Sequence, residues 1–492
     1  MTTTFDPFEA TIADIEAAYA AGTTTCVELA QYYLARIEAC DRGGPALNSI
    51  IAVSPTVMED AAALDQAYVD GGPVGPLHGV PVLVKDQVDV VGMPTTLGSV
   101  LLKDFYPDQD GVVVQKLREA GALILAKTTL GELAGGDAHG SLFGSTRNPY
   151  DTDRTPGGSS GGSGAAISAN LGAISVAQEG LASIRRPAAW NSCVGMRPSL
   201  GLVSRTGAYG CWPSRSGSLG PITRTVADAA AVLDAVSGYD GEDPSTSWGV
   251  GQLDGTFVSH LDDGALNGAR IGILRDVMGL GSDPTAEDFG QSRAVFDQAV
   301  AELRAAGGEV IDPVEIEDLM PLLSKRAFDS GKEAFENWMA RHDDPPYRDH
   351  ESFTREAQYE RAMWLRGGGR PSPWQATWEE YQVARDALRT NLLVTMAEHR
   401  LDAIVHITVE HTPTLITDGV NEPYVNMLGA PHLNTFLYDV PSITVPAGFT
   451  DAQLPVGITF LGRPYSDQTM VGLAHAYEQS THHRVPPSSC PA

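Results

Sequence analysis

Apolar residues along this chain follow two patterns, and the two alternate from one end to the other. Apolar side chains three or four residues apart share one face of a helix, whereas short continuous apolar runs bounded by Gly, Pro or Asp are typical of buried strands. The first pattern predicts two helices within residues 8–39, helices over 58–68, 112–120, 165–171, 226–236 and 287–306, mainly helical structure over 320–400, and a last helix over 467–479. The second predicts strands over residues 80–84, 122–126, 174–178, 270–274, 309–311, 403–407, 442–445 and 456–460.

Short buried strands that alternate with helices predict an α/β fold, with α/β/α layers around a central mixed β-sheet. No clear linker divides the 492 residues, and no repeat of fixed period occurs. We therefore expect a single large domain over residues 1–492. Within it, N-terminal helices occupy about residues 8–70, a core about 71–240, and a helical insertion about 320–400.

Composition limits the partners and the compartment. The 62 acidic residues outnumber the 33 basic ones, which gives a formal charge of -29. Such a surface repels nucleic acid and anionic membranes, so neither is expected as a partner. The five cysteines are widely spaced without a C-x-x-C pair, which argues against a disulfide framework or a zinc site. The chain shows no secretory signal pattern and no apolar run of eighteen residues, so a cytoplasmic location is predicted.

The first chemical candidate is Lys85, which ends the apolar run of Gly79–Asp86. Burial among apolar side chains lowers the pKa of a lysine because it penalises the charged form, so such a lysine can act as a base near neutral pH. Taken alone, the segment is explained equally well by a strand-end lysine that pairs with Asp86.

The second candidate is the Gly/Ser-rich segment of residues 157–164, where glycines let the backbone approach a small site closely. Three interpretations compete. No Gly-Lys-Ser/Thr follows, which argues against a phosphate cradle. Residues 158–162 fit the G-x-S-x-G nucleophile elbow, although that turn requires a preceding strand and Thr155-Pro156-Gly157 stands there instead. A flexible linker is the remaining interpretation.

The third candidate is Ser183, which follows the strand predicted over residues 174–178. Amides on the small-residue turn before it can point together at a developing oxyanion. The backbone donors of this oxyanion hole would be Gly180, Leu181, Ala182 and Ser183. A simple turn is the alternative.

Together and in this order, the three segments closely resemble those of the amidase signature family. The resemblance covers about residues 10–480. It extends to residues 127–128, 145–151, 195–199, 201–205, 220–228, 445–449 and 454–457. It implies the amidase signature fold and a cofactor-free amidohydrolase that cleaves a carboxamide C–N bond through a serine acyl-enzyme. The same acyl transfer extends to esters or carbamates.

The resemblance also implies a role for each catalytic residue. Ser183 matches the nucleophile, Lys85 the base, and Ser159 the bridging serine, which typically carries a cis peptide bond. Ser160 matches a supporting, hydrogen-bonding serine. In this scheme Lys85 draws the proton of Ser183 through Ser159, and the relay later protonates the leaving amine.

One segment departs from the family pattern. The family usually has Thr-Asp-Thr/Ile-Gly-Gly-Ser before its Ile-Arg pair, whereas this chain has Gln-Glu-Gly-Leu-Ala-Ser over residues 178–183. Glu179 keeps an acidic residue that can pair with Arg185. If Leu181 or Ala182 needs a positive φ, a side chain there costs on the order of 1 kcal/mol or more. We expect catalysis to be retained, with an altered oxyanion hole, because the four catalytic and supporting residues are intact.

The substrate is a small-molecule amide whose pocket the sequence does not define. Residues expected to shape that pocket are Thr129, Leu130, His406, Phe436 and Tyr438. Core packing is an equally good explanation for Phe436 and Tyr438. The spacing of His406, Glu410 and His411 fits no zinc-protease motif, so no metal is expected.

Two other functions stay open. The chain also resembles the amidase component of a glutamine-dependent tRNA amidotransferase, which works with partner subunits. The Leu181-Ala182 change alternatively suggests a binding protein that has lost catalysis. The oligomeric state is open as well, with a homodimer as one option.

Overall fold

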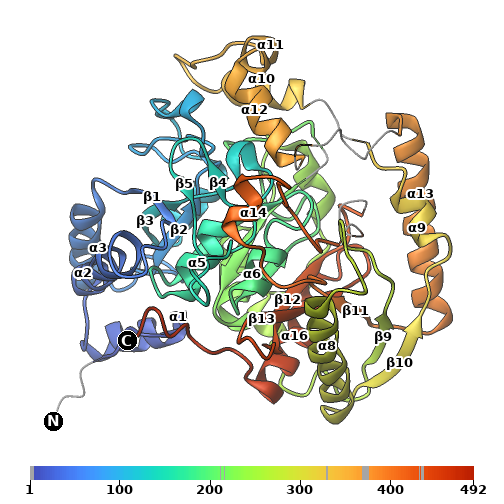
Figure 1. Ribbon diagram of the computed structural model, residues 1–492. Coiled ribbons are helices and arrows are strands. Elements are labelled where there is room, and N and C mark those ends of the chain that lie inside the picture. Colours follow the sequence, from blue (N-terminus) through green and yellow to red (C-terminus); the bar gives the residue numbers. More distant parts are fainter. Residues whose placement is uncertain are drawn as a thin grey trace.

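The computed structural model describes residues 5–210, 212–214, 217–327, 331–367, 369, 376–431, 433 and 437–492. An eleven-stranded sheet runs through it in the order β1-β3-β2-β6-β8-β7-β12-β13-β11-β9-β10 (Figure 1). The strands are β1 (Ile50–Val53), β2 (Pro81–Lys85), β3 (Leu123–Thr128), β6 (Ile174–Glu179), β7 (Val194–Arg197), β8 (Ser218–Thr223), β9 (Arg270–Leu274), β10 (Glu309–Val314), β11 (Ala403–Ile407), β12 (Ser442–Phe449) and β13 (Pro455–Leu461). A separate hairpin joins β4 (His139–Gly140) to β5 (Gly144–Ser145).

The sheet is mixed, as predicted. Strand β2 runs parallel to β3 and β6, whereas β8 runs antiparallel to β6 and β7. Strand β2 is buried along its whole length, which explains its continuous apolar run. The strands of this one sheet come from both halves of the chain, which favours the single domain that we propose.

Helices surround the sheet, which confirms the predicted α/β class. The helices α7 and α16 pack against each other and against β8 and β12 respectively, and α5 packs against α6. The helices are α1 (Ile12–Ala21), α2 (Cys26–Arg36), α3 (Val57–Gly71), α4 (Val112–Glu119), α5 (Gly161–Ser168), α6 (Arg185–Trp190), α7 (Val226–Val236), α8 (Glu287–Ala305), α9 (Leu319–Leu323), α10 (Lys332–Met339), α11 (His350–Thr354), α12 (Ala357–Arg366), α13 (Trp378–Glu398), α14 (Ile416–Val420) and α16 (Asp467–Thr481).

The N-terminal helices begin and end where their sequence signals lie. Helix α1 ends at Gly22, which adopts a left-handed φ of 64°. Thr25 then caps α2, because its hydroxyl accepts the amide of Glu28 while the Glu28 carboxylate accepts the amide of Thr25. This reciprocal capping box satisfies two amides that the helix itself leaves without partners.

Two features differ from the prediction. Strands β1, β7 and β8 were not expected: β1 is a four-residue edge strand, and glycine and proline interrupt the apolar pattern of β8. A β-carbon on Gly220 would lie 2.1 Å from the Met196 carbonyl oxygen, so close strand approach requires the glycine. In addition, α5 begins at Gly161, inside the segment expected to be a loop. Its glycines permit tight packing, which outweighs their poor helix propensity.

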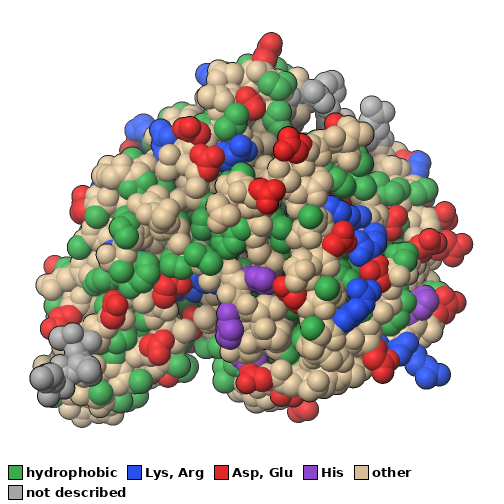
Figure 2. Space-filling view, turned by 60° about the horizontal axis from the view of Figure 1, so that its bottom comes forward, with side chains coloured by type: hydrophobic (Ala, Val, Ile, Leu, Met, Phe, Trp, Pro, Cys, Tyr) green, Lys and Arg blue, Asp and Glu red, His purple; other side chains and the backbone are tan. Residues whose placement is uncertain are grey.

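The predicted helical insertion consists of α9 to α13, which lie at the periphery (Figure 1). Helices α10, α11 and α12 form one group, and α9 lies beside α13. Acidic side chains are spread over the face shown in Figure 2, in keeping with the net charge. In the described part of the chain, every helix is too short or too polar to span a bilayer.

Candidate active site

Lys85 lies at the carboxyl end of β2 and is fully buried. Its Nζ donates to Ser159 Oγ at 2.8 Å and to the Gln178 carbonyl oxygen at 3.2 Å. The pairing with Asp86 that was an alternative explanation is wrong, because Asp86 contacts Lys127 Nζ at 2.9 Å instead. Lys85 and Ser159 therefore meet directly although 74 residues separate them.

The surroundings of Lys85 favour its neutral form. Burial lowers the pKa of the Lys85 amine well below its ordinary value, and the positive charge of Arg366 lowers it further. The Glu179 carboxylate opposes both effects. A neutral amine within hydrogen-bond distance of a serine hydroxyl can accept that hydroxyl's proton.

The turn that presents Ser159 is held by close backbone packing. The Gly158–Ser159 peptide bond is cis. A β-carbon on Gly158 would lie 2.3 Å from the Gly136 carbonyl oxygen, so only glycine fits there. Arg186 donates from Nε and from an NH2 group to the Gly158 carbonyl oxygen and forms a buried ion pair with Asp137.

Ser160 connects this turn to the strand that precedes Ser183. Its hydroxyl donates to the Gln178 carbonyl oxygen at 3.2 Å, the same atom that accepts from Lys85. Its backbone amide donates to the Ser183 carbonyl oxygen at 3.2 Å. Ser160 therefore ties the Gly/Ser turn to both sides of the Ser183 segment.

Glu179 shapes the turn that carries Ser183. One of its carboxylate oxygens accepts the backbone amides of Ile184 and Arg185, each at 2.9 Å. The other contacts the Arg185 guanidinium at 2.7 Å, and both side chains are fully buried. The expected pair of Glu179 and Arg185 is confirmed, and it fixes the backbone directly after Ser183.

The backbone before Ser183 adopts ordinary conformations. Neither Leu181 nor Ala182 has a positive φ, so replacement of the family's glycine pair introduces no left-handed strain. Within the described residues, the amides of Gly180, Ala182 and Ser183 have no acceptor. These free donors are available to an oxyanion.

Ser183 is the accessible member of the group. Its side chain is half-buried, whereas Lys85 and Ser159 are almost completely buried. The Ser183 hydroxyl has no hydrogen-bond partner in the part of the chain that the structure describes. The structure thus brings Lys85 to Ser159 and ties the Ser183 backbone to Ser160, and leaves the Ser183 hydroxyl open to an incoming group.

Two of the expected pocket residues are part of the scaffold. Thr129 and Leu130 are fully buried. The Thr129 hydroxyl lies 2.7 Å from that of Thr146 and donates to the Ser49 carbonyl oxygen at 3.2 Å. The Thr129 side chain is therefore engaged in internal contacts.

The other three lie in different surroundings. His406 is buried in β11, with Nδ1 2.6 Å from the Ile407 carbonyl oxygen. Tyr438 is half-buried between the ring of Trp248 and the guanidinium of Arg385, at centroid distances of 6.5 and 4.7 Å. Phe436 lies outside the described residues.

The His406 region does not form a metal centre. The Glu410 carboxylate accepts the amides of Met278 and Gly279, at 2.8 and 3.0 Å, and burial raises its pKa. His411 Nδ1 pairs with Asp288 at 3.0 Å. Among the described residues, no three His, Cys, Asp or Glu side chains are grouped as a metal would require.

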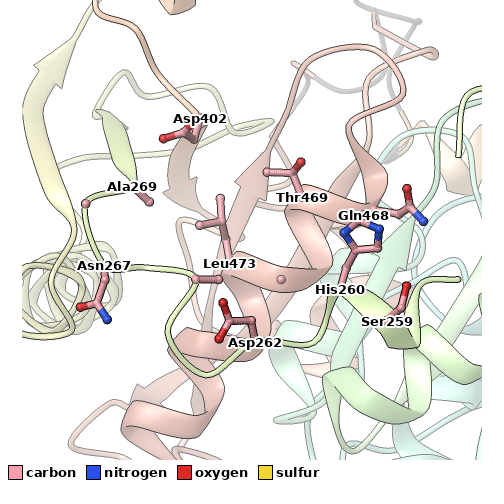
Figure 3. Close-up of a pocket in the computed structure, with 12 residues that line it drawn as sticks. Ser259, His260, Asp262, Asn267, Ala269, Asp402, Gln468, Thr469 and Leu473 are labelled. Carbon is pink, nitrogen blue, oxygen red and sulfur yellow. The ribbon is translucent and has the colours of Figure 1, made fainter. Parts of the chain in front are cut away.

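A surface hollow of about 560 Å³ lies elsewhere, between residues 259–269 and α16 (Figure 3). None of the three predicted catalytic residues lines it. Its polar groups are used internally: Gln468 accepts the Asp254 amide at 2.9 Å, and His260 Nε2 lies 2.8 Å from the Asp254 carbonyl oxygen. This hollow is therefore not the candidate active site.

Comparisons with known proteins agree with this geometry. The family model described as Amidase matches residues 28–471. The solved structure of native peptide amidase from Stenotrophomonas maltophilia is similar with a TM-score of 0.84 and 33% identity, and the match covers 99% of this chain and 100% of that one. An amidase family protein from Bacillus anthracis has a TM-score of 0.82 at 28% identity, over 98% and 93% of the two chains. The A-type component of glutamyl-tRNA(Gln) amidotransferase from Gloeobacter violaceus is 33% identical, over 96% of this chain and 98% of the relative.

Proposed function

Because this chain belongs to the amidase family, whose members are amidohydrolases acting on C–N bonds, we propose that it hydrolyses a small-molecule carboxamide through an acyl-enzyme on Ser183. The observation that carries the proposal is the 2.8 Å contact between Lys85 Nζ and Ser159 Oγ in a fully buried setting. No cofactor is needed, because the proposed residues supply the nucleophile, the base and the oxyanion donors.

In the first half-reaction, Ser183 Oγ attacks the amide carbonyl carbon. Its proton passes to Ser159, while the Ser159 proton passes to the neutral amine of Lys85. The carbonyl oxygen becomes an oxyanion, which the amides of Ala182 and Ser183 stabilise. The proton then returns from Lys85 through Ser159 to the leaving nitrogen, the C–N bond breaks, and ammonia or an amine departs.

In the second half-reaction, water attacks the ester carbonyl of the acyl-enzyme. Its proton follows the same route to Lys85 and returns to Ser183 Oγ as the ester bond breaks, so the enzyme is restored and a carboxylic acid is released. Since an ester or a carbamate presents a similar carbonyl to Ser183, we propose that the site accepts these substrates too.

The test replaces Lys85, Ser159 and Ser183 singly with alanine. Hydrolysis is measured on a panel of aliphatic amides, aryl amides and carbamates. Exposed residues provide matched controls: Lys103→Ala for the lysine and Ser259→Ala for the serines. We expect the three site variants to lose hydrolysis and both controls to keep it. Activity that survives Ser183→Ala or Lys85→Ala would refute the mechanism.

A second candidate function is that of the amidase component of an amidotransferase. The relatives that are named as part of glutamyl-tRNA(Gln) amidotransferase favour it, and that name weighs against the predicted absence of a nucleic-acid partner. Co-purification with a tRNA-binding protein, together with glutamine-dependent amidation of charged tRNA, would support this role. Amide hydrolysis by the chain alone, without any such partner, would favour the first proposal.

A third candidate, an inactive binding protein, makes a different prediction. A fluorophosphonate probe would then fail to label Ser183 in the folded protein. The unstrained backbone at Leu181 and Ala182 argues against this candidate, because it removes the reason to expect lost catalysis. We further propose a cytoplasmic enzyme, and sedimentation analysis would decide between a monomer and a homodimer.

A further inference from the structure

Arg366, the last residue of α12, brings a guanidinium near the candidate site without a carboxylate partner. Within the described residues, its one polar contact is Met363 Sδ at 3.9 Å. The arginines beside Ser183 differ, because Arg185 and Arg186 are buried in ion pairs with carboxylates. In a chain with a net charge of -29, an unpaired and half-buried cation beside the catalytic lysine calls for a ligand.

The guanidinium lies on a floor of glycines that adjoins the catalytic turn. A β-carbon on Gly135 would lie 1.9 Å from Arg366 Nε, and one on Gly136 would lie 3.7 Å from Arg366 Cα. The carbonyl oxygen of Gly136 in turn packs against Gly158, the residue before Ser159. Any side chain on this floor would displace Arg366, so the glycines make room for it.

Two polar contacts hold α12 on this floor. The Asn426 side chain accepts the Asp137 amide at 3.3 Å and donates to the Leu365 carbonyl oxygen at 3.1 Å. At the start of the helix, Gln358 donates to the Glu132 carboxylate at 3.0 Å. The backbone that carries Arg366 is therefore positioned before any ligand arrives, which reduces the entropy lost on binding.

The charge of Arg366 reaches the reacting groups. After burial, Arg366 is the second influence that lowers the pKa of Lys85, so the guanidinium lies within electrostatic range of that amine. Next to Arg366, the ring of Trp364, which is 48% exposed, contacts the ring of Tyr424 at a centroid distance of 4.9 Å. The arrangement offers a cation with an apolar border.

We propose that Arg366 is a specificity-determining residue that binds a carboxylate carried by the substrate close to its scissile amide. The planar guanidinium matches a carboxylate with two parallel hydrogen bonds. The inference rests on the proposed amidase function and names its substrate class: carboxylate-bearing amides. The acyl side and the leaving side of the amide are distinguished by experiment.

The test compares matched substrates that differ only in charge. On the acyl side, glutaric acid monoanilide is compared with its methyl ester. On the leaving side, N-butyryl-4-aminobenzoate is compared with its methyl ester. We expect the wild-type protein to prefer the acid of at least one pair by about 10- to 100-fold in kcat/KM, the range of a hydrogen bond to a charged group.

Substitution then assigns that preference to one residue. Arg366→Ala should abolish it mainly through the acid substrate, Arg366→Lys should keep part of it, and Arg361→Ala, an exposed arginine on the same helix, should leave it unchanged. If the wild-type protein shows no preference for either acid, or if Arg366→Ala slows acid and ester equally, the proposal is overturned. An equal loss would indicate an effect on Lys85 alone.

A binding measurement separates this inference from the proposed function. Calorimetric titration of Ser183→Ala with the unreacted acids and esters reports recognition without turnover. Tighter binding of an acid, lost in Ser183→Ala/Arg366→Ala, supports the inference even if the wild-type protein hydrolyses none of the amides. Turnover of acid and ester alike, with equal binding, retains the amidase and rejects the role of Arg366.

Discussion

Two lysines on neighbouring strands, Lys85 and Lys127, are equally buried and differ in what surrounds their amines. The side chains of both have no solvent exposure. Lys127 Nζ contacts the Asp86 carboxylate at 2.9 Å and donates to the Pro94 carbonyl oxygen and the Thr95 hydroxyl, at 2.7 and 2.8 Å. Lys85 has a serine hydroxyl and a backbone carbonyl oxygen as its partners.

The difference shows how a fold can assign opposite tasks to one residue type. A buried ammonium needs a counter-charge, and Asp86 supplies one to Lys127. No carboxylate contacts Lys85 within the described residues, and burial therefore lowers the pKa of its amine. We infer that Lys127 is a structural cation and that Lys85 is held ready as a base.

The largest expected effect separates the two lysines by activity. Lys85→Ala should reduce kcat/KM by about 100- to 10,000-fold, the usual contribution of a general base. Lys127→Ala should reduce activity only as far as it unfolds the protein. The measurement is kcat/KM per folded molecule, with the folded fraction taken from circular dichroism. A loss of turnover in folded Lys127→Ala equal to that in Lys85→Ala would remove the distinction.

The next effect concerns stability at Asp86. Asp86→Asn leaves the Lys127 ammonium buried without its counter-charge, which should destabilise the protein by about 3–5 kcal/mol. The free energy of unfolding is measured in urea. The double variant Asp86→Asn/Lys127→Met serves as the control and should recover much of the loss. A destabilisation below about 1 kcal/mol would be that of an exposed pair and would contradict the assignment.

A third prediction uses pH on the Lys85 side. Its pKa is depressed in the folded protein, so the unfolded chain binds more protons at any pH between the folded and unfolded pKa values. Lys85 therefore destabilises the fold increasingly as pH falls from about 10.4 toward the folded pKa. Lys85→Met should stabilise the protein more at pH 7 than at pH 10.

Urea unfolding of wild type and Lys85→Met at both pH values measures this difference. Lys103→Met, at an exposed lysine paired with Asp104, is the control and should show little change with pH. A stability gain from Lys85→Met that is equal at pH 7 and pH 10 would mean that Lys85 does not have a depressed pKa.

The smallest effect is expected at the turn before Ser183. Leu181→Gly/Ala182→Gly restores the family's glycine pair, yet neither residue has a positive φ that a glycine would relax. We expect a stability change within about 1 kcal/mol and little change in kcat, because the backbone already adopts ordinary angles. Stopped-flow acylation and urea unfolding measure both. A gain in acylation rate of tenfold or more would show that these side chains impair the oxyanion hole.

Much of the site followed from local sequence. Lys85 ends an apolar run that could only be a buried strand, and Glu179 with Arg185 forms a pair within one turn. These features depend on neighbours along the chain, and the structure places them as the pattern predicts. The predicted strands over 403–407 and 456–460 were found for the same reason, as β11 and β13.

Features made by distant segments were not predictable. The buried pair of Asp137 and Arg186 joins residues 49 positions apart, and Arg366 reaches the glycine floor from the peripheral insertion. No local signal marks such contacts. Strand β8 was missed because Gly220 and Pro221 interrupt its apolar pattern, although the close approach of Met196 is what requires that glycine.

The rate at which a fluorophosphonate acylates Ser183, followed against pH, tests the central claim most directly. The neutral form of Lys85 should activate Ser183, so the wild-type rate should rise with pH through one ionisation well below the ordinary lysine pKa. In Lys85→Met the rate should be low at every pH, and this rise should be absent. An unchanged rise in Lys85→Met, with wild-type rates, would show that another group activates Ser183.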